Sequence, residues 1–232
     1  MPELLRVPTH GDEEHRYALR PRPKSSFQTV LSADDVIDPE GTRIARVSTR
    51  VGDEVSLEFE FPLKRGTIRE TFALRREGER LAAERLTRSV YDAAELRIRH
   101  EEIAFGADVI PLPEAVYPEV TLPFLLRWQP FDGKKRDLFA WINDRFVARV
   151  EYVSKGKTQL ELGGAKRDAI KLIMYPDFND WVRLGKVLNK LAHPFVPKYH
   201  MWYSPEPPHD LLRFEGPFGP PGAPEVLMEL AD

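Results

Sequence analysis

Residues 54–61 read EVSLEFEF, and this stretch decides the fold class. Every second position carries an apolar side chain: Val55, Leu57, Phe59 and Phe61. That period is typical of a β-strand with one buried face. The same alternation recurs in residues 66–76 (GTIRETFALRR) and in residues 95–104 (ELRIRHEEIA). We therefore expect a mainly β protein built from short antiparallel strands.

The positions of the prolines indicate where the sheet continues. The chain has 232 residues and 21 prolines. None of the prolines lies between Lys64 and Ile110 or between Phe131 and Tyr175. Because proline cannot donate a hydrogen bond to a β ladder, it avoids central strands, and these two windows are expected to hold most of the sheet. With the alternating segments near the C-terminus, the pattern predicts about eleven strands.

Two short helices are expected to interrupt the strands. One covers residues 121–128, with Thr121 as N-cap and Pro123 in the first turn. The other covers residues 180–192 and has one apolar face: Trp181, Leu184, Leu188 and Leu191. Residues 1–40 show no period, so we expect an extended or partly disordered N-terminal arm there, followed by a single β domain over residues 41–232.

Composition excludes several classes of protein. The chain has 34 basic and 37 acidic residues and a net charge of −3, which argues against nucleic-acid binding. Without cysteine it holds no disulfide scaffold, thiol nucleophile or iron–sulfur cluster. No apolar run is long enough for a membrane-spanning helix or a signal peptide. We therefore expect a soluble, cytoplasmic protein, or a periplasmic one if the sequence is a trimmed mature form.

The histidines do not indicate a metal or a cofactor. His193, His200 and His209 are separated by spacings that match no compact zinc signature. We expect neither a metal nor a cofactor.

Polar residues inside the strands offer a candidate acid–base site. His100 lies near Glu84 and Glu102 in the expected strand pattern. If these strands line a concave surface, a buried carboxylate beside an imidazole could act as acid and base. The alternative is that the three side chains face solvent or form cross-strand ion pairs.

Aromatic side chains gather in the second half of the chain, and five are candidate ligand contacts: Trp128, Trp141, Trp181, Tyr199 and Trp202. Aromatic residues line cavities for apolar molecules, and they also fill the core of any curved sheet. In the first interpretation Arg127 or His200 would orient a polar head group. Alternation within residues 199–203 (YHMWY) places Tyr199 and Trp202 on opposite faces of one strand.

Four segments carry a pattern known from one family: residues 122–128 (LPFLLRW), 141–153 (WINDRFVARVEYV), 157–177 (KTQLELGGAKRDAIKLIMYPD) and 198–219 (KYHMWYSPEPPHDLLRFEGPFG). This succession resembles a bacterial family of domains without assigned function, distantly related to the LolA-like periplasmic lipoprotein-carrier fold. The resemblance implies a strongly curved antiparallel sheet, or half-barrel, with helices covering its concave side. It carries over no catalytic residue.

These observations favour a non-catalytic binding or carrier protein for a hydrophobic small molecule or lipid. A cofactor-independent isomerase, cyclase or hydrolase acting in an apolar β-barrel cavity is the first alternative, with His100 and Glu84 or Glu102 as its acid and base. The second alternative is an assembly protein that docks a protein partner through residues 1–40.

Overall fold

The computed structural model describes residues 5–6, 12–21, 42–49, 54–105, 115–143, 146–176, 198–217 and 225–231. These residues form thirteen strands in one sheet. The strands are β1 (Glu13–Pro21), β2 (Thr42–Thr49), β3 (Glu54–Leu63), β4 (Gly66–Glu77), β5 (Arg80–Asp92), β6 (Arg97–Ala104), β7 (Val116–Pro118), β8 (Arg136–Asn143), β9 (Phe146–Leu162), β10 (Ala165–Pro176), β11 (Tyr199–Tyr203), β12 (Leu211–Pro217) and β13 (Glu225–Leu230).

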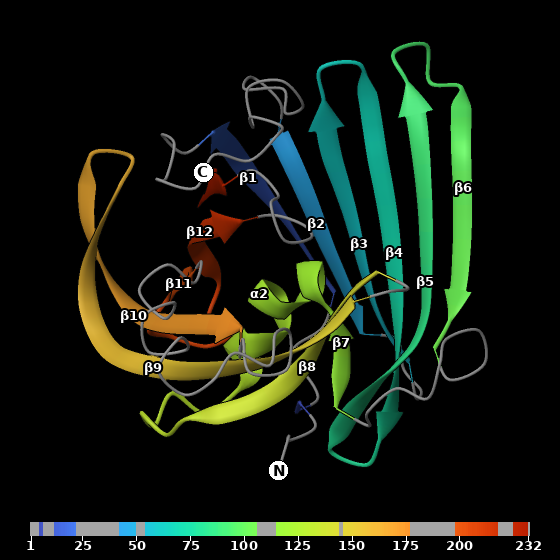
Figure 1. The fold of residues 1–232 in the computed structure, drawn as a ribbon. Coiled ribbons are helices and arrows are strands. Elements are labelled where there is room, and N and C mark those ends of the chain that lie inside the picture. Colours follow the sequence, from blue (N-terminus) through green and yellow to red (C-terminus); the bar gives the residue numbers. More distant parts are fainter. Residues whose placement is uncertain are drawn as a thin grey trace, which may run out of the picture.

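The sheet consists of two meanders joined by the first and last strands. Its order is β6-β5-β4-β3-β2-β1-β13-β12-β11-β10-β9-β8-β7. Neighbouring strands are antiparallel except for β7 and β8, which are parallel. The sheet curls around a short central helix (Figure 1). The prediction of a mainly β, strongly curved antiparallel sheet is therefore confirmed.

The number of strands differs from the expected eleven for local reasons. The segments RFVARVEYV and KTQLEL form a single strand, β9, in which Gly156 adopts a φ of 80°. This left-handed backbone lies beside a register shift in the pairing with β10, so the chain bends there without leaving the sheet. In addition, β1, β2 and the three-residue β7 carry little alternation and were not expected as strands.

The strand β1 lies within the segment expected to be an N-terminal arm. Tyr17 pairs with Arg43 of β2 on one side and with Leu230 of β13 on the other, so β1 joins the two meanders. The side chains of Leu5, Tyr17 and Leu19 are buried in the core. For residues 13–21, the expectation of an arm outside the β domain is wrong.

A helical segment fills the concave side of the sheet. It comprises η1 (Glu119–Thr121), α2 (Leu122–Leu125) and η2 (Leu126–Trp128), in agreement with the helix expected over residues 121–128. Pro123 lies in its first turn, where no backbone N–H is required. Phe124 packs against Tyr17 and Phe59, with ring centroids 5.7 and 5.0 Å apart, and the hydroxyl of Tyr203 in β11 donates a hydrogen bond of 2.8 Å to the carbonyl oxygen of Pro123, so α2 contacts both meanders. The second expected helix, residues 180–192, lies outside the described residues.

The two faces of the sheet differ in what they pack against. We call the face that shares the main core with α2 the inner face; it carries the paired side chains of Leu57, Phe72 and Leu86. On the outer face of β9–β12 a second, smaller cluster contains Leu160, Leu162, Ala169, Trp202 and Leu212. Among the described residues, no helix is long and apolar enough to cross a membrane.

Candidate functional site

Arg127, at the end of the central helical segment, is a buried cation that contacts two carboxylates. Its side chain is 0% exposed, its Nη2 forms an ion pair with Glu13 Oε1, and its Nη1 lies 3.6 Å from Asp210 Oδ1. Burial lowers the pKa of Arg127 to about 10, and the nearby charge of Asp210 opposes this shift. The guanidinium therefore remains charged at neutral pH, and its charge is balanced by Glu13 of β1 and by Asp210, the residue before β12.

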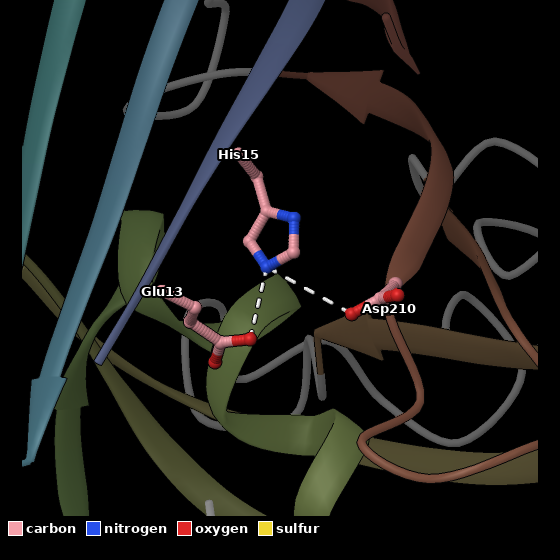
Figure 2. A group of neighbouring side chains, drawn as sticks. All are labelled: Glu13, His15 and Asp210. Atoms are coloured by element: carbon pink, nitrogen blue, oxygen red, sulfur yellow. Dashed lines mark hydrogen bonds and ion pairs between the residues drawn. The ribbon is translucent and has the colours of Figure 1, made fainter. Parts of the chain in front are cut away.

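His15 completes this group, which we call the Arg127 cluster: Glu13, His15, Arg127 and Asp210. Figure 2 shows His15 Nε2 between the two carboxylates, 3.0 Å from Glu13 Oε2 and 3.8 Å from Asp210 Oδ1. Burial lowers the pKa of His15, and the charge of Asp210 partly offsets that effect. A neutral imidazole protonated on Nε2 can donate a hydrogen bond to Glu13.

The Arg127 cluster contains atoms that are suited to metal ligation. Glu13, His15 and Asp210 each offer one ligand atom, and these atoms lie within 4.8 Å of one another. Two carboxylates and an imidazole suit a divalent transition metal. However, Arg127 already places a positive charge against both carboxylates, and a metal ion would be repelled by it. The contacts are those of an ion-pair network that joins β1, η2 and the start of β12.

A second polar group lies inside the core, between the central helix and β11. The hydroxyl of Tyr199 donates a hydrogen bond of 2.7 Å to Glu119 Oε1. Burial raises the pKa of Glu119 to about 8, although the hydrogen bond from Tyr199 acts in the opposite direction. The negative charge of Glu70 raises this pKa further. Glu119 is therefore mostly protonated at neutral pH.

A row of charged side chains crosses the inner face of β4, β5 and β6. Glu70, Arg88 and Glu101 are successive cross-strand partners. Arg88 Nε lies 2.6 Å from Glu70 Oε1, and Arg88 Nη1 lies 3.7 Å from Glu101 Oε2. Because Arg88 lies two positions from Leu86 on the same strand, this row borders the main core.

Beyond the charged row, the inner face carries an apolar row that we call the inner strip: Phe61, Ile68 and Val90. All three side chains are half-buried, whereas the core row of Leu57, Phe72 and Leu86 is almost inaccessible. The strands β3–β6 extend beyond α2 toward the turn between β3 and β4, where the inner strip lies (Figure 1). The helix therefore covers the core row and leaves the inner strip partly open.

The aromatic residues expected to line one cavity lie in two places. Trp128, Trp141 and Tyr199 pack in or against the main core. Trp202 belongs to the outer cluster, and His200 stacks on it with ring centroids 5.9 Å apart. The structure therefore brings neither Trp202 nor His200 to the face that carries Arg127. Trp181 lies outside the described residues.

The three residues expected to act as acid and base are exposed. His100 Nδ1 lies 2.9 Å from Ser89 Oγ, and Glu102 lies 3.8 Å from Arg85. His100 and Glu102 project from the outer face, and Glu84 sits where the pairing of β4 and β5 shifts register. These placements correspond to the solvent-facing, cross-strand interpretation. The carboxylates beside the core are Glu70 and Glu119.

Sequence reasoning missed Glu13, His15, Glu119 and Asp210. The spacing of Glu13 and His15 places both side chains on one face of a strand, and Glu119 stands alone in the apolar run VYPEVTLPFLL. The sequence therefore contained a signal for Glu13, His15 and Glu119, but it did not indicate which residues they contact. Comparison with known proteins adds no family: no protein-family model matches the chain, and neither does any curated protein. The resemblance to a lipoprotein-carrier fold stays a prediction from the sequence.

Proposed function

We propose that the protein is a non-catalytic binding or carrier protein for an apolar small molecule or lipid, which it holds against the inner strip. The observation that carries the proposal is the partial exposure of Phe61, Ile68 and Val90 on the face that elsewhere forms the core. Covering such a row with an apolar molecule contributes roughly 25 cal/mol per Å² of apolar surface removed from water.

The architecture around the inner strip supports this proposal. Curved antiparallel sheets bind apolar ligands on their concave face when side chains do not fill that face completely. Here the ring of Phe124 packs against Tyr17 and Phe59, and these contacts hold α2 over the core row. The charged row of Glu70, Arg88 and Glu101 marks the boundary between the filled and the open parts of the inner face.

The Arg127 cluster has a structural role in this proposal. Because Glu13 and Asp210 already balance the charge of Arg127, an anionic head group would have to displace one of them. We therefore place the ligand on the inner strip and not on Arg127. The cofactor-independent enzyme stays an alternative prediction from the sequence.

The test is binding of a fluorescent fatty acid, cis-parinaric acid, followed by its emission. The variant Ile68→Lys places a charge in the inner strip, and the matched control Thr71→Lys places the same charge on the outer face of the same strand, where Thr71 is exposed. We expect Ile68→Lys to weaken binding at least about tenfold, which corresponds to about 1.4 kcal/mol. Thr71→Lys should bind like the wild type. Equal binding by both variants, or none by the wild type, would contradict the proposal.

A further inference from the structure

Among the described residues, the strand β6 forms one end of the sheet, and no other strand pairs with the outer backbone edge of its residues 97–102. It pairs with β5 on one side, and the strand order of the described residues contains no strand beyond it. Figure 1 shows β6 as the outermost strand of its meander. A free edge carries a row of N–H and C=O groups that can pair with another strand.

The same edge exposes apolar surface. Within the described part of the chain, the large hydrophobic side chains that are exposed are Leu96 and Ile98, at 64% and 66%. Ile98 lies in the N-terminal part of β6, where residues 97–100 are exposed on both faces of the sheet, and Leu96 directly precedes the strand. An exposed apolar strand at a sheet edge is a common docking site for a further strand.

The order of charges along β6 selects the orientation of such a strand. Arg97 and Arg99 precede Glu101 and Glu102. Suppose that a second β6 pairs antiparallel and keeps the inner face continuous. The two-fold axis between the strands then lies beside one residue near the middle of β6, either Arg99 or His100. Centred on Arg99, it places Arg97 opposite Glu101 of the second copy; centred on His100, it places Arg99 there. In-register parallel pairing would instead set like charges side by side, which is unfavourable.

We propose that β6 pairs antiparallel with β6 of a second copy of this chain, so that the protein forms a two-fold symmetric dimer through this edge. Each copy then supplies hydrogen-bond partners for the free backbone edge of the other and covers Ile98. Two symmetric arginine–glutamate contacts form with either centring, and they favour the antiparallel over the in-register parallel orientation. This inference rests on β6 alone and does not depend on the proposed ligand.

Sedimentation velocity of the full chain tests the proposal. The wild type should form a dimer that dissociates on dilution. The variant Arg97→Glu/Arg99→Glu and the variant Glu101→Arg/Glu102→Arg should each dimerise at least about tenfold more weakly, because like charges then face each other. An equimolar mixture of the two variants should form a heterodimer, since opposite charges are restored across the pair.

Two further variants separate this effect from loss of folding, because within one chain Glu101 also contacts Arg88 and Arg99, and Glu102 contacts Arg85. Ile98→Lys leaves these contacts intact and should also weaken the dimer. Lys155→Glu/Lys157→Glu reverses two exposed charges on β9 and should dimerise like the wild type. A wild type that stays monomeric at all concentrations, or folded β6 variants that dimerise as well as the wild type, would overturn the proposal.

Discussion

Tyr199 and Glu119, separated by 80 positions in the chain, meet inside the core through a 2.7 Å hydrogen bond. The bond connects β11 to the first turn of the central helical segment. Because the pKa of Glu119 is raised to about 8, the pair is mostly neutral at neutral pH, so it can lie in the core without an opposing charge. The same property makes the folded protein sensitive to alkaline pH.

Replacing Glu119 by Gln should change how stability depends on pH. The pKa of Glu119 is higher in the folded protein, about 8, than its ordinary value of 4.5. Between these two pKa values the folded state binds more protons than the unfolded state. The contribution of Glu119 to the free energy of unfolding is therefore fully present below the unfolded pKa, and it is lost as pH rises toward the folded pKa. Between the two pKa values, the free energy of unfolding of the wild type should fall by about 1.4 kcal/mol per pH unit relative to that of Glu119→Gln. Urea denaturation from pH 5 to 9 measures this difference, and a difference that stays constant across the range would contradict the assignment.

Replacing Arg127 by Met should destabilise the fold, because it leaves Glu13 and Asp210 without their cation. Removal of one partner of a buried ion pair costs about 3–5 kcal/mol, and the partial exposure of both carboxylates favours the lower end of that range. The double variant Arg127→Met/Glu13→Gln should recover part of the loss. Denaturant titration at pH 7 measures both, and a single variant as stable as the wild type would show that the Arg127 cluster contributes nothing.

Tyr17→Ala should destabilise the protein by about 3–5 kcal/mol, because Tyr17 fills the core between β1 and Phe124. Arg16→Ala, next along the strand and facing solvent, should change stability by less than about 0.5 kcal/mol. Thermal melting followed by circular dichroism compares the two. If residues 1–40 were only a docking arm, both variants would melt like the wild type.

The sequence predicted the strands that alternate between core and solvent, because that pattern is local. Residues 54–61 and 66–76 form β3 and β4, with Leu57 and Phe72 on the inner face as their period requires. The central strand β1 escaped prediction because its buried pair, Tyr17 and Leu19, is short and lies among charges. Its partners β2 and β13 are set by topology and not by neighbouring residues.

The polar clusters were harder to predict for a related reason. Glu13, Arg127 and Asp210 come from three distant segments, and only the curl of the sheet brings them together. Residue type alone also did not indicate which face of the sheet an aromatic side chain occupies. The alternation in YHMWY separates Tyr199 from Trp202, and the structure places these two residues in different clusters. Alternation with Ile68 and Phe72 correctly indicates the inner face for Glu70, whereas the alternation of Leu96 and Ile98, which includes Glu102, follows side chains that are exposed.

Native mass spectrometry of the protein as purified tests whether the inner strip holds an apolar ligand. We expect the wild type to carry an apolar molecule, seen as a discrete mass increment. That increment should be lost in Ile68→Lys and kept in Thr71→Lys. A wild type that shows only the mass of the bare chain, even after incubation with a broad panel of lipids, would contradict the claim that the inner strip binds an apolar ligand.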